Sequence, residues 1–498
     1  MLVEDIVALA VMKTGRPVKL ELTREEQFIA TTTRHPMQVR IKVGAYGDGR
    51  LSAVQLDVVS NTGAYGNHGA GTLHHACGES LGVYRCDNKK VDAYAVYTNT
   101  LPAGAFRGYG LSQTIFAVES AMDELARALS IDPFVFRRRN VVQPGDPMVS
   151  VDREPNDVEY GSYGLDQCLD AVAQDLALPD TPALSPEWLI GQGVALAMLD
   201  TIPPRGHHCE ARATLCDDGH YAVSVGTAEF GNGTTTVHQQ IAAAALGAAP
   251  GAIEIVQSDT DRVGYDTGAF GSTGTVVAGS ATHRAAAGLA TAILDFAADF
   301  AGCGRQACTL GPGSVTCMDR DISLAALALS ARDAGRDLHA TGHANGSPRS
   351  VAFNVQGFRV AVHRRTGEIR ILKSSHAADA GVVINPMQCL GQVEGGIAMA
   401  LGAALFEGVG IDGAGRVMNR TFRQYHIPAF ADIPLSRIHF ADTFDRLGPA
   451  GAKSMSESPF KPGCGRLGQC DPRCDGHPLP ADAFHAGPNL SPSGRRPP

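Results

Sequence analysis

The stretch FRVAVHRRTGEIRIL, residues 358–372, alternates apolar and polar side chains on both sides of a Thr366-Gly367 turn. Alternation with a period of two is typical of a half-buried strand, so the stretch predicts a β-hairpin. The segment GQVEGGIAMALGAALFEG, residues 391–408, predicts a glycine-rich helix whose small residues face its neighbours. Helices and strands mixed in this way, without strict alternation, favour an α+β fold over a doubly wound sheet.

Other segments extend the same mixture of helices and strands. Apolar residues between Ile6 and Met12 have helical spacing, and Val18–Leu22 alternates as a strand does. Residues 37–60 predict two paired strands joined at Gly47-Asp48-Gly49, and Ser112 is the expected N-cap of a helix. Further predicted elements are a helix beginning at Asp132-Pro133, strands at Val223–Val225 and Ile253–Val256, and helices over 238–246 and 276–300.

The composition is that of a globular protein and excludes several functional classes. Of 498 residues, 44% are hydrophobic and 19% are charged, which excludes extended disorder for most of the chain. A net charge of −9 without a long basic run argues against a general nucleic-acid binder. No run approaches the length of a membrane-spanning helix, and Glu4 and Asp5 stand where a signal peptide would be basic. We therefore expect a cytoplasmic protein.

Glycine is over-represented, with 57 residues in 498, a share above the usual value of roughly 7%. Four glycine-rich loops lie just before or at the start of predicted helices: AFRGYGLSQ (105–113), EFGNG (229–233), DTGAFGSTG (266–274) and GQVEG (391–395). Backbone N–H groups in such loops bind anions. For the first loop, the alternative is a structural loop with an exposed Arg107. Four loops together favour an extended, phosphate-bearing organic cofactor over a bare metal ion.

Cysteine and histidine residues give little sign of a protein-bound metal. Nine cysteines are scattered from Cys77 to Cys389 without a C-x-x-C pair, so we expect neither a disulfide framework nor a zinc ribbon in the main body. The run His207–Glu210 has potential ligands, but adjacent side chains point in different directions, and we expect no metal site there. Near the end of the chain, Cys464, Cys470, Cys474 and His477 have a zinc-like composition.

Seven segments, taken in order, resemble the molybdenum-binding large subunit of the xanthine dehydrogenase/aldehyde oxidase family. They are GRPVKLELTREEQF, AFRGYGLSQ, FRRRNVVQPGDPM, GTAEFGNGTTTVHQQIA, YDTGAFGSTGTVVAG, VINPMQCLGQVEGGIAMALG and GAKSMSESP. The resemblance covers about residues 1–460. It implies an α+β architecture of two elongated molybdopterin-binding domains, with the cofactor between them. It also implies oxidative hydroxylation of an N-heterocycle or an aldehyde, with water as the oxygen source.

The resemblance sets the expected domain boundaries. We expect the C-terminal part of a first molybdopterin-binding domain over 1–178, a linker over 179–188 and a second such domain over 189–460. The family's upstream third, with a GGFGGK-type loop, has no counterpart here. After the GAKSMSESP motif the family continues with an alanine-rich helix, whereas this chain reads KPGCGRLGQCDPRCDGHPLP. We hypothesise a shifted reading frame near Pro462, which makes 461–498 a disordered tail and not a zinc site.

The resemblance also assigns site residues. Glu457 matches the glutamate of the family's GAKGVGE motif and is expected to be the general base of the hydroxylation, with Arg107 as a second catalytic residue. Because the pterin dithiolene holds molybdenum in this family, no protein ligand to the metal is expected. The expected cofactor-binding residues are Ala105, Phe106, Arg107, Gly231, Asn232 (in place of a glutamine), Phe270, Gly271 and Gln392.

Substrate and partners follow less directly from the family. Tyr109 stands where purine-type enzymes have phenylalanine, and His75 falls near their substrate-orienting arginine. The aromatic residue that would cover a purine has no clear match near Asp200–Pro203, so an N-heterocycle and an aldehyde both remain candidates. The family implies molybdopterin, commonly as the cytosine dinucleotide, with [2Fe–2S] and FAD on partner subunits or missing domains of a hetero-oligomer. The rival hypothesis is a non-catalytic remnant that cannot hold the cofactor.

Overall fold

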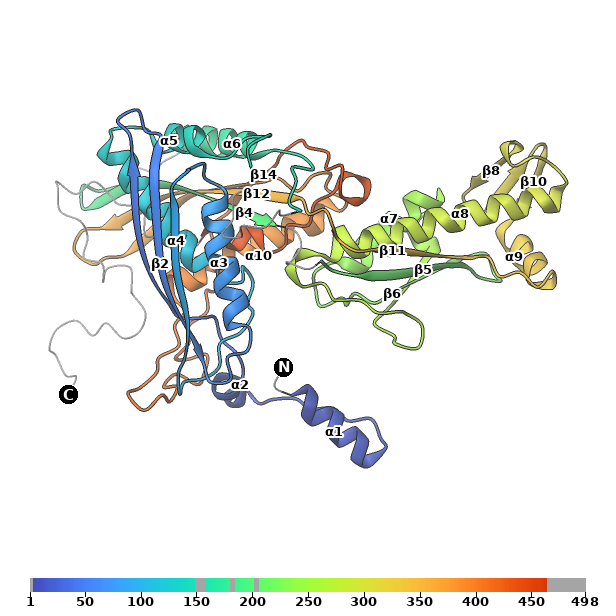
Figure 1. Ribbon diagram of the computed structural model, residues 1–498, viewed down its shortest axis with the longest axis horizontal. Helices are drawn as coiled ribbons and strands as arrows, with labels where there is room; N and C mark the ends of the chain where they lie inside the picture. Colours follow the sequence, from blue (N-terminus) through green and yellow to red (C-terminus); the bar gives the residue numbers. More distant parts are fainter. Residues whose placement is uncertain (1–2, 148–156, 180–183, 201–205, 464–498) are drawn as a thin grey trace.

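Two lobes, one broad and one narrow, lie end to end along the molecule (Figure 1). The computed structural model describes residues 3–147, 157–179, 184–200 and 206–463. Thr201–Pro203 and the cysteine-rich residues 464–498, on which the reading-frame hypothesis and the zinc-like composition rest, lie outside the described residues. Helices and strands are both abundant throughout the described chain, so the predicted α+β class is confirmed.

The broad lobe contains two sheets and most of the helices (Figure 1). One sheet has the order β1-β2-β3, in which β1 and β2 are antiparallel and β2 and β3 are parallel. The other sheet has the order β14-β13-β12-β4. The strands are β1 Met37–Ala45, β2 Leu51–Gly63, β3 Lys89–Tyr97, β4 Trp188–Asp200, β12 Val351–His363, β13 Ile369–Ala378 and β14 Ser436–Phe440. The helices are α3 Gly69–Gly82, α4 Leu111–Ala128, α5 Pro133–Asn140, α6 Leu165–Ala177 and α10 Pro386–Leu405.

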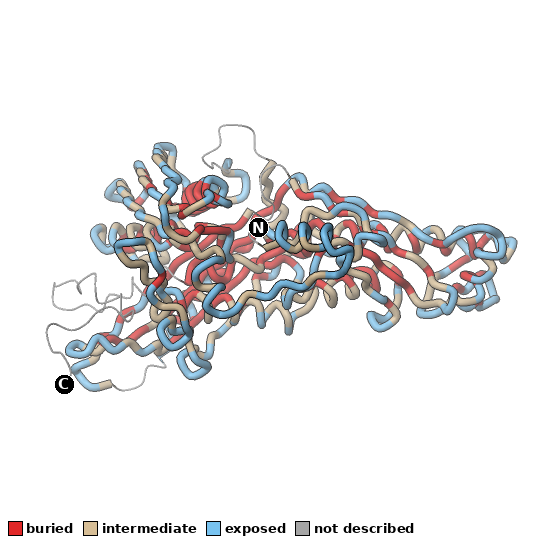
Figure 2. The backbone as a smooth tube through the Cα atoms, turned by 90° about the horizontal axis from the view of Figure 1, so that it is seen from below, coloured by how far each residue is buried: buried red, intermediate tan, exposed pale blue. Residues whose placement is uncertain are grey.

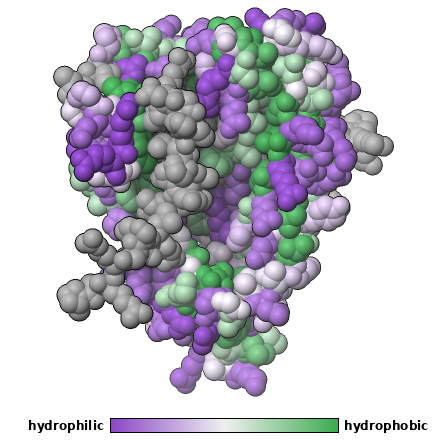
Figure 3. Space-filling view, turned by 90° about the vertical axis from the view of Figure 1, so that its left-hand side faces the viewer, coloured by the Kyte–Doolittle hydropathy of each residue, from purple (hydrophilic) through white to green (hydrophobic). Residues whose placement is uncertain are grey.

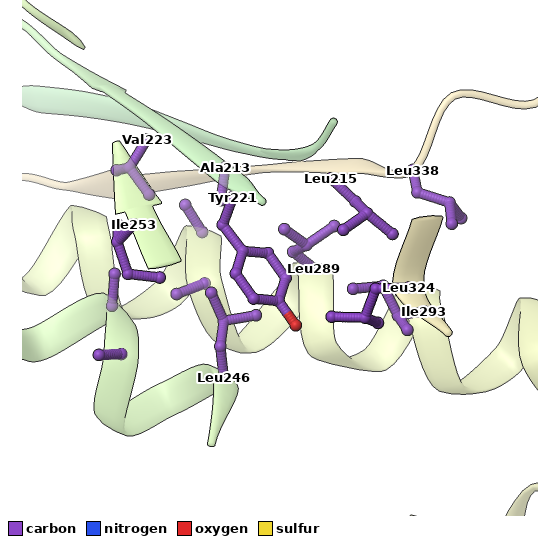
Figure 4. Close-up of a cluster of buried hydrophobic side chains, with 14 of the residues drawn as sticks. Ala213, Leu215, Tyr221, Val223, Leu246, Ile253, Leu289, Ile293, Leu324 and Leu338 are labelled. Carbon is purple, nitrogen blue, oxygen red and sulfur yellow. The ribbon is translucent and has the colours of Figure 1, made fainter. Parts of the chain in front are cut away.

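The narrow lobe is a four-stranded sheet, of order β11-β5-β6-β7, packed against the long helix α8. Leu289 and Ile293 of α8 point toward the strands, and Tyr221 of β6 is buried beside Leu246 of α7 (Figure 4). A small sheet, β10-β9-β8, and helix α9 form the far tip (Figure 1). The elements are β5 Cys209–Leu215, β6 Tyr221–Val225, α7 Thr234–Leu246, β7 Ile253–Gln257, α8 Gly279–Ala301, β8 Cys308–Gly311, β9 Ser314–Cys317, β10 Arg320–Ser323, α9 Leu324–Asp333 and β11 His339–Ala344.

The core of the broad lobe draws on both halves of the chain. Buried Leu56 and Met122 pack in one hydrophobic cluster with Leu196 of β4 and Phe353 of β12. Buried segments run through the broad lobe and continue along the narrow one (Figure 2). On the end of the broad lobe seen in Figure 3, hydrophobic residues form a broken band among hydrophilic ones. No helix in the described part of the chain combines the length and apolarity needed to cross a membrane.

Most predicted elements are confirmed, and two details are wrong. The hairpin around Thr366-Gly367 is β12–β13, and the paired strands over 37–60 are β1 and β2. Val18–Leu22 is not a strand: it follows the exposed helix α1 (Glu4–Thr14) and precedes α2 (Arg24–Ala30), and alternation yields a strand only where a neighbour supplies hydrogen bonds. Ser112 lies inside α4, because left-handed Gly110 takes the N-cap position.

A buried charge cluster ties α4 and α5 to β4. The Arg137 side chain is fully buried and donates to Glu119 at 2.9 Å and to Asp123 at 2.5 Å. Glu119 also accepts the Tyr84 hydroxyl at 2.5 Å and the Leu196 backbone N–H at 3.1 Å. Since each charge has a partner, the cluster is stable as a set and sensitive to loss of any single member.

We predict that Arg137→Met destabilises the protein by about 3–5 kcal/mol, because Glu119 and Asp123 then remain buried without their cation. Urea unfolding followed by circular dichroism measures the change. The matched control is Arg138→Met, since Arg138 is the next residue of α5 and pairs with the exposed Asp170. This control should change stability by less than about 1 kcal/mol. Equal effects of the two substitutions would contradict the assignment.

Candidate functional site

The segment Ala452–Glu457 crosses the junction between α10 and the narrow lobe. It starts at a bridge between Ala452 and Gly381, where an added Cβ on Gly381 would meet the Gly451 carbonyl at 2.3 Å. Lys453 of the segment is completely buried, and its ammonium group lies 2.6 Å from the Asp379 carboxylate. Close backbone contact and a buried ion pair therefore fix the segment that carries Glu457.

Glu457 itself is partly buried and is bound by a serine from the glycine-rich loop 266–274. The Ser272 hydroxyl donates to Glu457 Oε2 at 3.2 Å and accepts the Glu457 backbone N–H at 3.4 Å. The Ser456 hydroxyl lies 3.2 Å from the same Ser272 oxygen. Since Ser272 has one hydroxyl proton and donates it to Glu457, Ser456 is the donor in that contact. The carboxylate is therefore held in one orientation.

Arg107 links its loop to α10 and to the Glu457 segment. Its Nε donates to the Ser456 carbonyl at 2.6 Å, and its second terminal nitrogen donates to the Gln392 carbonyl at 2.9 Å. Burial lowers the pKa of Arg107, and the nearby Glu457 charge opposes this shift. The purely structural alternative expected an exposed Arg107. That expectation is wrong, because the guanidinium is half-buried and joins two distant parts of the chain.

His75 and Tyr109 lie against each other, and the charge of Glu457 acts on both. Their rings are 5.4 Å apart, and the Tyr109 hydroxyl lies 3.0 Å from His68 Nδ1. Tyr109 has a φ of 43° between Gly108 at 91° and Gly110 at 89°, so three successive left-handed residues turn its ring toward α3. The Glu457 charge acts on the pKa values of His75 and Tyr109 as well as Arg107, which places all four residues in one neighbourhood.

Two buried residues that sequence reasoning missed support His75. Glu79, one turn later on α3, lies 2.6 Å from His75 Nε2, and the Lys461 ammonium group donates to Glu79 at 3.0 Å. Burial alone would lower the pKa of His75, but the Glu79 carboxylate raises it and the net shift is upward. The i,i+4 spacing of His75 and Glu79 was a signal for this pair. Nothing in the sequence pointed to Lys461.

A cleft of about 110 Å³ opens between the start of α7, the loop 266–274, the first turns of α10 and the segment Ala452–Ser456, next to Glu457. Three of the four glycine-rich loops line it, through Asn232, Ser272 and Gln392. The loop 391–395 does so from within α10, because that helix begins earlier, at Pro386. The remaining lining residues that are polar or glycine are Thr234, Gly274, Thr275, Asn385, Gln388, Lys453, Ser454 and Ser456.

The cleft suits a neutral or anionic heterocycle that makes many hydrogen bonds. Asn385 at the N-cap of α10 lines it, so one helix N-terminus contributes partial positive charge, whereas the Glu229 carboxylate already accepts the Gly233 and Thr235 backbone N–H groups at the start of α7. Gln388 Oε1 is buried there without a hydrogen-bond partner among the described residues. The described lining contains one lysine and no carboxylate. These features fit a phosphate-bearing pterin better than a bare cation.

The remaining predicted residues lie at the edges of this region. Phe106 is 45% exposed and stacks on the Arg34 guanidinium at 4.2 Å, and Ala105 beside it is exposed. Phe270 is exposed with its ring 4.5 Å from His207, and Gly271 next to it has a φ of 66°. Gly231 accepts a long contact of 3.5 Å from Gln392.

The run His207–Glu210 does not form a metal-ligand group in the described chain, where three other residues, Cys303, Cys308 and Cys317, do cluster. The His207 ring is buried against Phe270, and Cys209 is buried in the core of the narrow lobe. His208 lies against Tyr265 instead. The side chains of this run therefore have different neighbours: Phe270 for His207, Tyr265 for His208 and the lobe core for Cys209.

Comparison with known proteins matches this geometry to a family. Two family models match, each described as a molybdopterin cofactor-binding domain, over residues 1–141 and 177–434. A probable hypoxanthine oxidase, XdhD, of Escherichia coli K12 is 34% identical over 92% of this chain and 49% of its own length. XdhA of the same organism, a putative xanthine dehydrogenase molybdenum-binding subunit, is 32% identical over 92% of this chain and 62% of its own length.

Solved structures agree with these relatives. Quinoline 2-oxidoreductase of Pseudomonas putida superposes with a TM-score of 0.82 at 26% identity, over 93% of this chain and 62% of that one. Aldehyde oxidoreductase of Desulfovibrio gigas shares the fold, with a TM-score of 0.79 at 24% identity, over 94% of this chain and 50% of that one. This chain thus spans between about half and two thirds of these proteins' lengths. It belongs to the family of molybdenum-binding large subunits of xanthine dehydrogenases and aldehyde oxidases, with two molybdopterin cofactor-binding domains.

Proposed function

We propose that this chain is the catalytic part of a molybdenum hydroxylase that oxidises an N-heterocycle or an aldehyde with water as the oxygen source. The observation that carries the proposal is the position of Glu457. Its carboxylate accepts a hydrogen bond from Ser272, which lines the cleft together with Asn232 and Gln392, and its charge acts on the pKa values of His75 and Tyr109. A carboxylate near both a cofactor cleft and a substrate pocket is suited to general base catalysis.

The residues that line the cleft would bind the cofactor, and those around Glu457 would take part in proton transfer. Asn232, Gln388 and Gln392 would hydrogen-bond the pterin in the cleft, and the N-terminus of α10 would hold its phosphate. When bound, the molybdenum cofactor supplies the two-electron oxidation of the substrate. Glu457, oriented by Ser272, would accept the proton that the oxygen nucleophile releases on attacking the substrate carbon. Arg107 would tie the main chain just before this carboxylate, at Ser456, to α10 at Gln392.

We predict that Glu457→Gln lowers turnover by roughly 10²–10⁴-fold, because the amide keeps the hydrogen-bonding shape and cannot accept the proton. Turnover is measured with aldehydes and N-heterocycles and an artificial electron acceptor. Molybdenum content, measured by mass spectrometry, should stay at the level of the unaltered protein. Glu368→Gln, at the exposed β12–β13 turn, is the control and should leave turnover unchanged. Undiminished turnover of Glu457→Gln at full molybdenum content would refute the base assignment.

The finer identity of the cofactor and its partners belongs to the same proposal. We propose the cytosine dinucleotide form of molybdopterin, with [2Fe–2S] and FAD on partner subunits or domains that receive the electrons. The domain boundaries at 178 and 189 remain predictions. Molybdenum and pterin analysis of the purified chain tests the whole scheme. Molybdenum with pterin fluorescence supports it, and the absence of both favours the non-catalytic remnant.

The charge of His75 defines the substrate pocket further. Since Glu79 raises the pKa of His75, the imidazolium is favoured, and it presents a cationic donor where purine-type enzymes have an arginine. A folded pKa above the unfolded value adds stability below the unfolded pKa, near 6.5, and this stability is lost as pH rises through the folded pKa. We therefore propose a substrate with a hydrogen-bond acceptor, such as a ring nitrogen or a carbonyl oxygen.

We predict that Glu79→Gln lowers the pKa of His75 below that of free imidazole, because burial remains and the carboxylate charge is lost. NMR titration of histidine-labelled protein measures this pKa, and His75→Gln assigns the resonance. Asp218→Asn is the matched control, since Asp218 raises the pKa of the exposed His220 in the narrow lobe. It should lower the pKa of His220 and leave that of His75 unchanged. A His75 pKa that does not respond to Glu79→Gln would contradict the pairing.

A further inference from the structure

Three cysteines converge at the tip of the narrow lobe, far along the molecule from α10 (Figure 1). Cys303 follows the end of α8, Cys308 is the first residue of β8, and Cys317 is the last residue of β9. Their sulfur atoms all lie within 4.8 Å of one another, and those of Cys303 and Cys308 are 3.5 Å apart. They are the one group of three potential metal ligands found in the described chain.

The local fold explains how residues from three segments meet. Gly302 ends α8 in the left-handed conformation, with a φ of 64°, and turns the chain so that Cys303 comes back against the helix end. Cys308 and Cys317 are direct partners across the antiparallel pair β8–β9. The short turn over Arg305–Ala307 connects Cys303 to Cys308 at the start of β8. The cluster therefore lies where the end of α8 meets the β8–β9 hairpin, which also packs into the hydrophobic core of the narrow lobe.

The separations match a metal cage better than a disulfide. Thiolates bound at about 2.3 Å around one zinc ion lie roughly 3.8 Å apart in tetrahedral geometry and about 4.0 Å apart in trigonal geometry. A disulfide needs sulfur atoms at about 2.05 Å. Sulfur separations between 3.5 Å and 4.8 Å thus require shifts of less than about 1 Å to surround a cation. Cys308 and Cys317 are 8% and 0% exposed, whereas Cys303 is partly exposed and offers an entry path.

We propose that Cys303, Cys308 and Cys317 form a three-thiolate site for a thiophilic d¹⁰ cation, Zn²⁺ or Cu⁺. Binding replaces three S–H bonds with three metal–sulfur bonds and releases three protons to solvent, without oxidation or reduction. Soft thiolate ligands select these two ions over harder divalent cations. A trigonal site suits Cu⁺, and Zn²⁺ would take a water molecule as its fourth ligand. The site is separate from the molybdenum chemistry, and its role is to cross-link the tip of the narrow lobe.

The test uses the full-length chain with Cys464, Cys470 and Cys474 replaced by serine, because those residues could bind the same ions. Protein kept reduced and anaerobic is loaded with Zn²⁺ or, separately, with Cu⁺ delivered as its bicinchoninate complex. Gel filtration removes the excess, and elemental mass spectrometry counts the retained ions. We expect about one ion per chain, with X-ray absorption showing sulfur ligands at about 2.3 Å. The Zn²⁺-loaded and Cu⁺-loaded samples are then each mixed with a chromophoric chelator. The ion that stays bound to the protein identifies the cation of the site.

Cys317→Ser and Cys303→Ser should each lower retention at least tenfold. Cys303→Ser guards against misfolding, because this cysteine is partly exposed and its replacement disturbs the core least. Cys216→Ser, a partly buried cysteine of the same lobe outside the cluster, is the matched control and should retain the ion. The proposal is wrong if the parent protein retains neither ion. It is also wrong if Cys303→Ser retains as much of the ion as the parent protein does. A mass loss of 2 Da without bound metal would also overturn it and indicate a disulfide instead.

Discussion

The close passage of the final segment, residues 452–461, against α10 and the Arg107 loop is the constraint on which the site depends. Three glycines permit it. A Cβ on Gly396 would lie 2.6 Å from Pro459, and one on Gly108 would lie 3.0 Å from Phe460. Gly381 makes the corresponding contact at the start of the segment. Any side chain at these positions would push the segment outward and move Glu457 away from Ser272.

Buried charges then hold the segment that the glycines admit. Lys453 pairs with Asp379 near one end, and Lys461 pairs with Glu79 at the other. Both lysine side chains are fully buried, so each would be costly without its carboxylate. In the second pair, Glu79 contacts His75 as well as Lys461. Glu79 thus helps to hold the final segment and also acts on the charge of His75.

Local patterns predicted most of the secondary structure, and motif resemblance predicted most of the proposed site. The hairpin at Thr366-Gly367 and the helix after Asp132 depend on neighbouring residues and could be predicted from them. Val18–Leu22 could not, because a strand needs a partner that the alternation itself does not reveal. Lys461 and Glu79 are separated by 382 positions, and the spacing of Cys303, Cys308 and Cys317 matches no common ligand motif. Such pairs become visible only when the fold brings them together.

The two hydrogen bonds of Arg107 carry a consequence for biosynthesis. They join residues that are 349 and 285 positions apart, at Ser456 and Gln392. During translation the first half of the chain emerges long before α10 and residues 452–461, so the walls of the cleft cannot close around a ligand until those residues have been made. A ribosome-bound intermediate that ends between α10 and residue 452 would present an open half-site, with its arginine anchored to Gln392 alone.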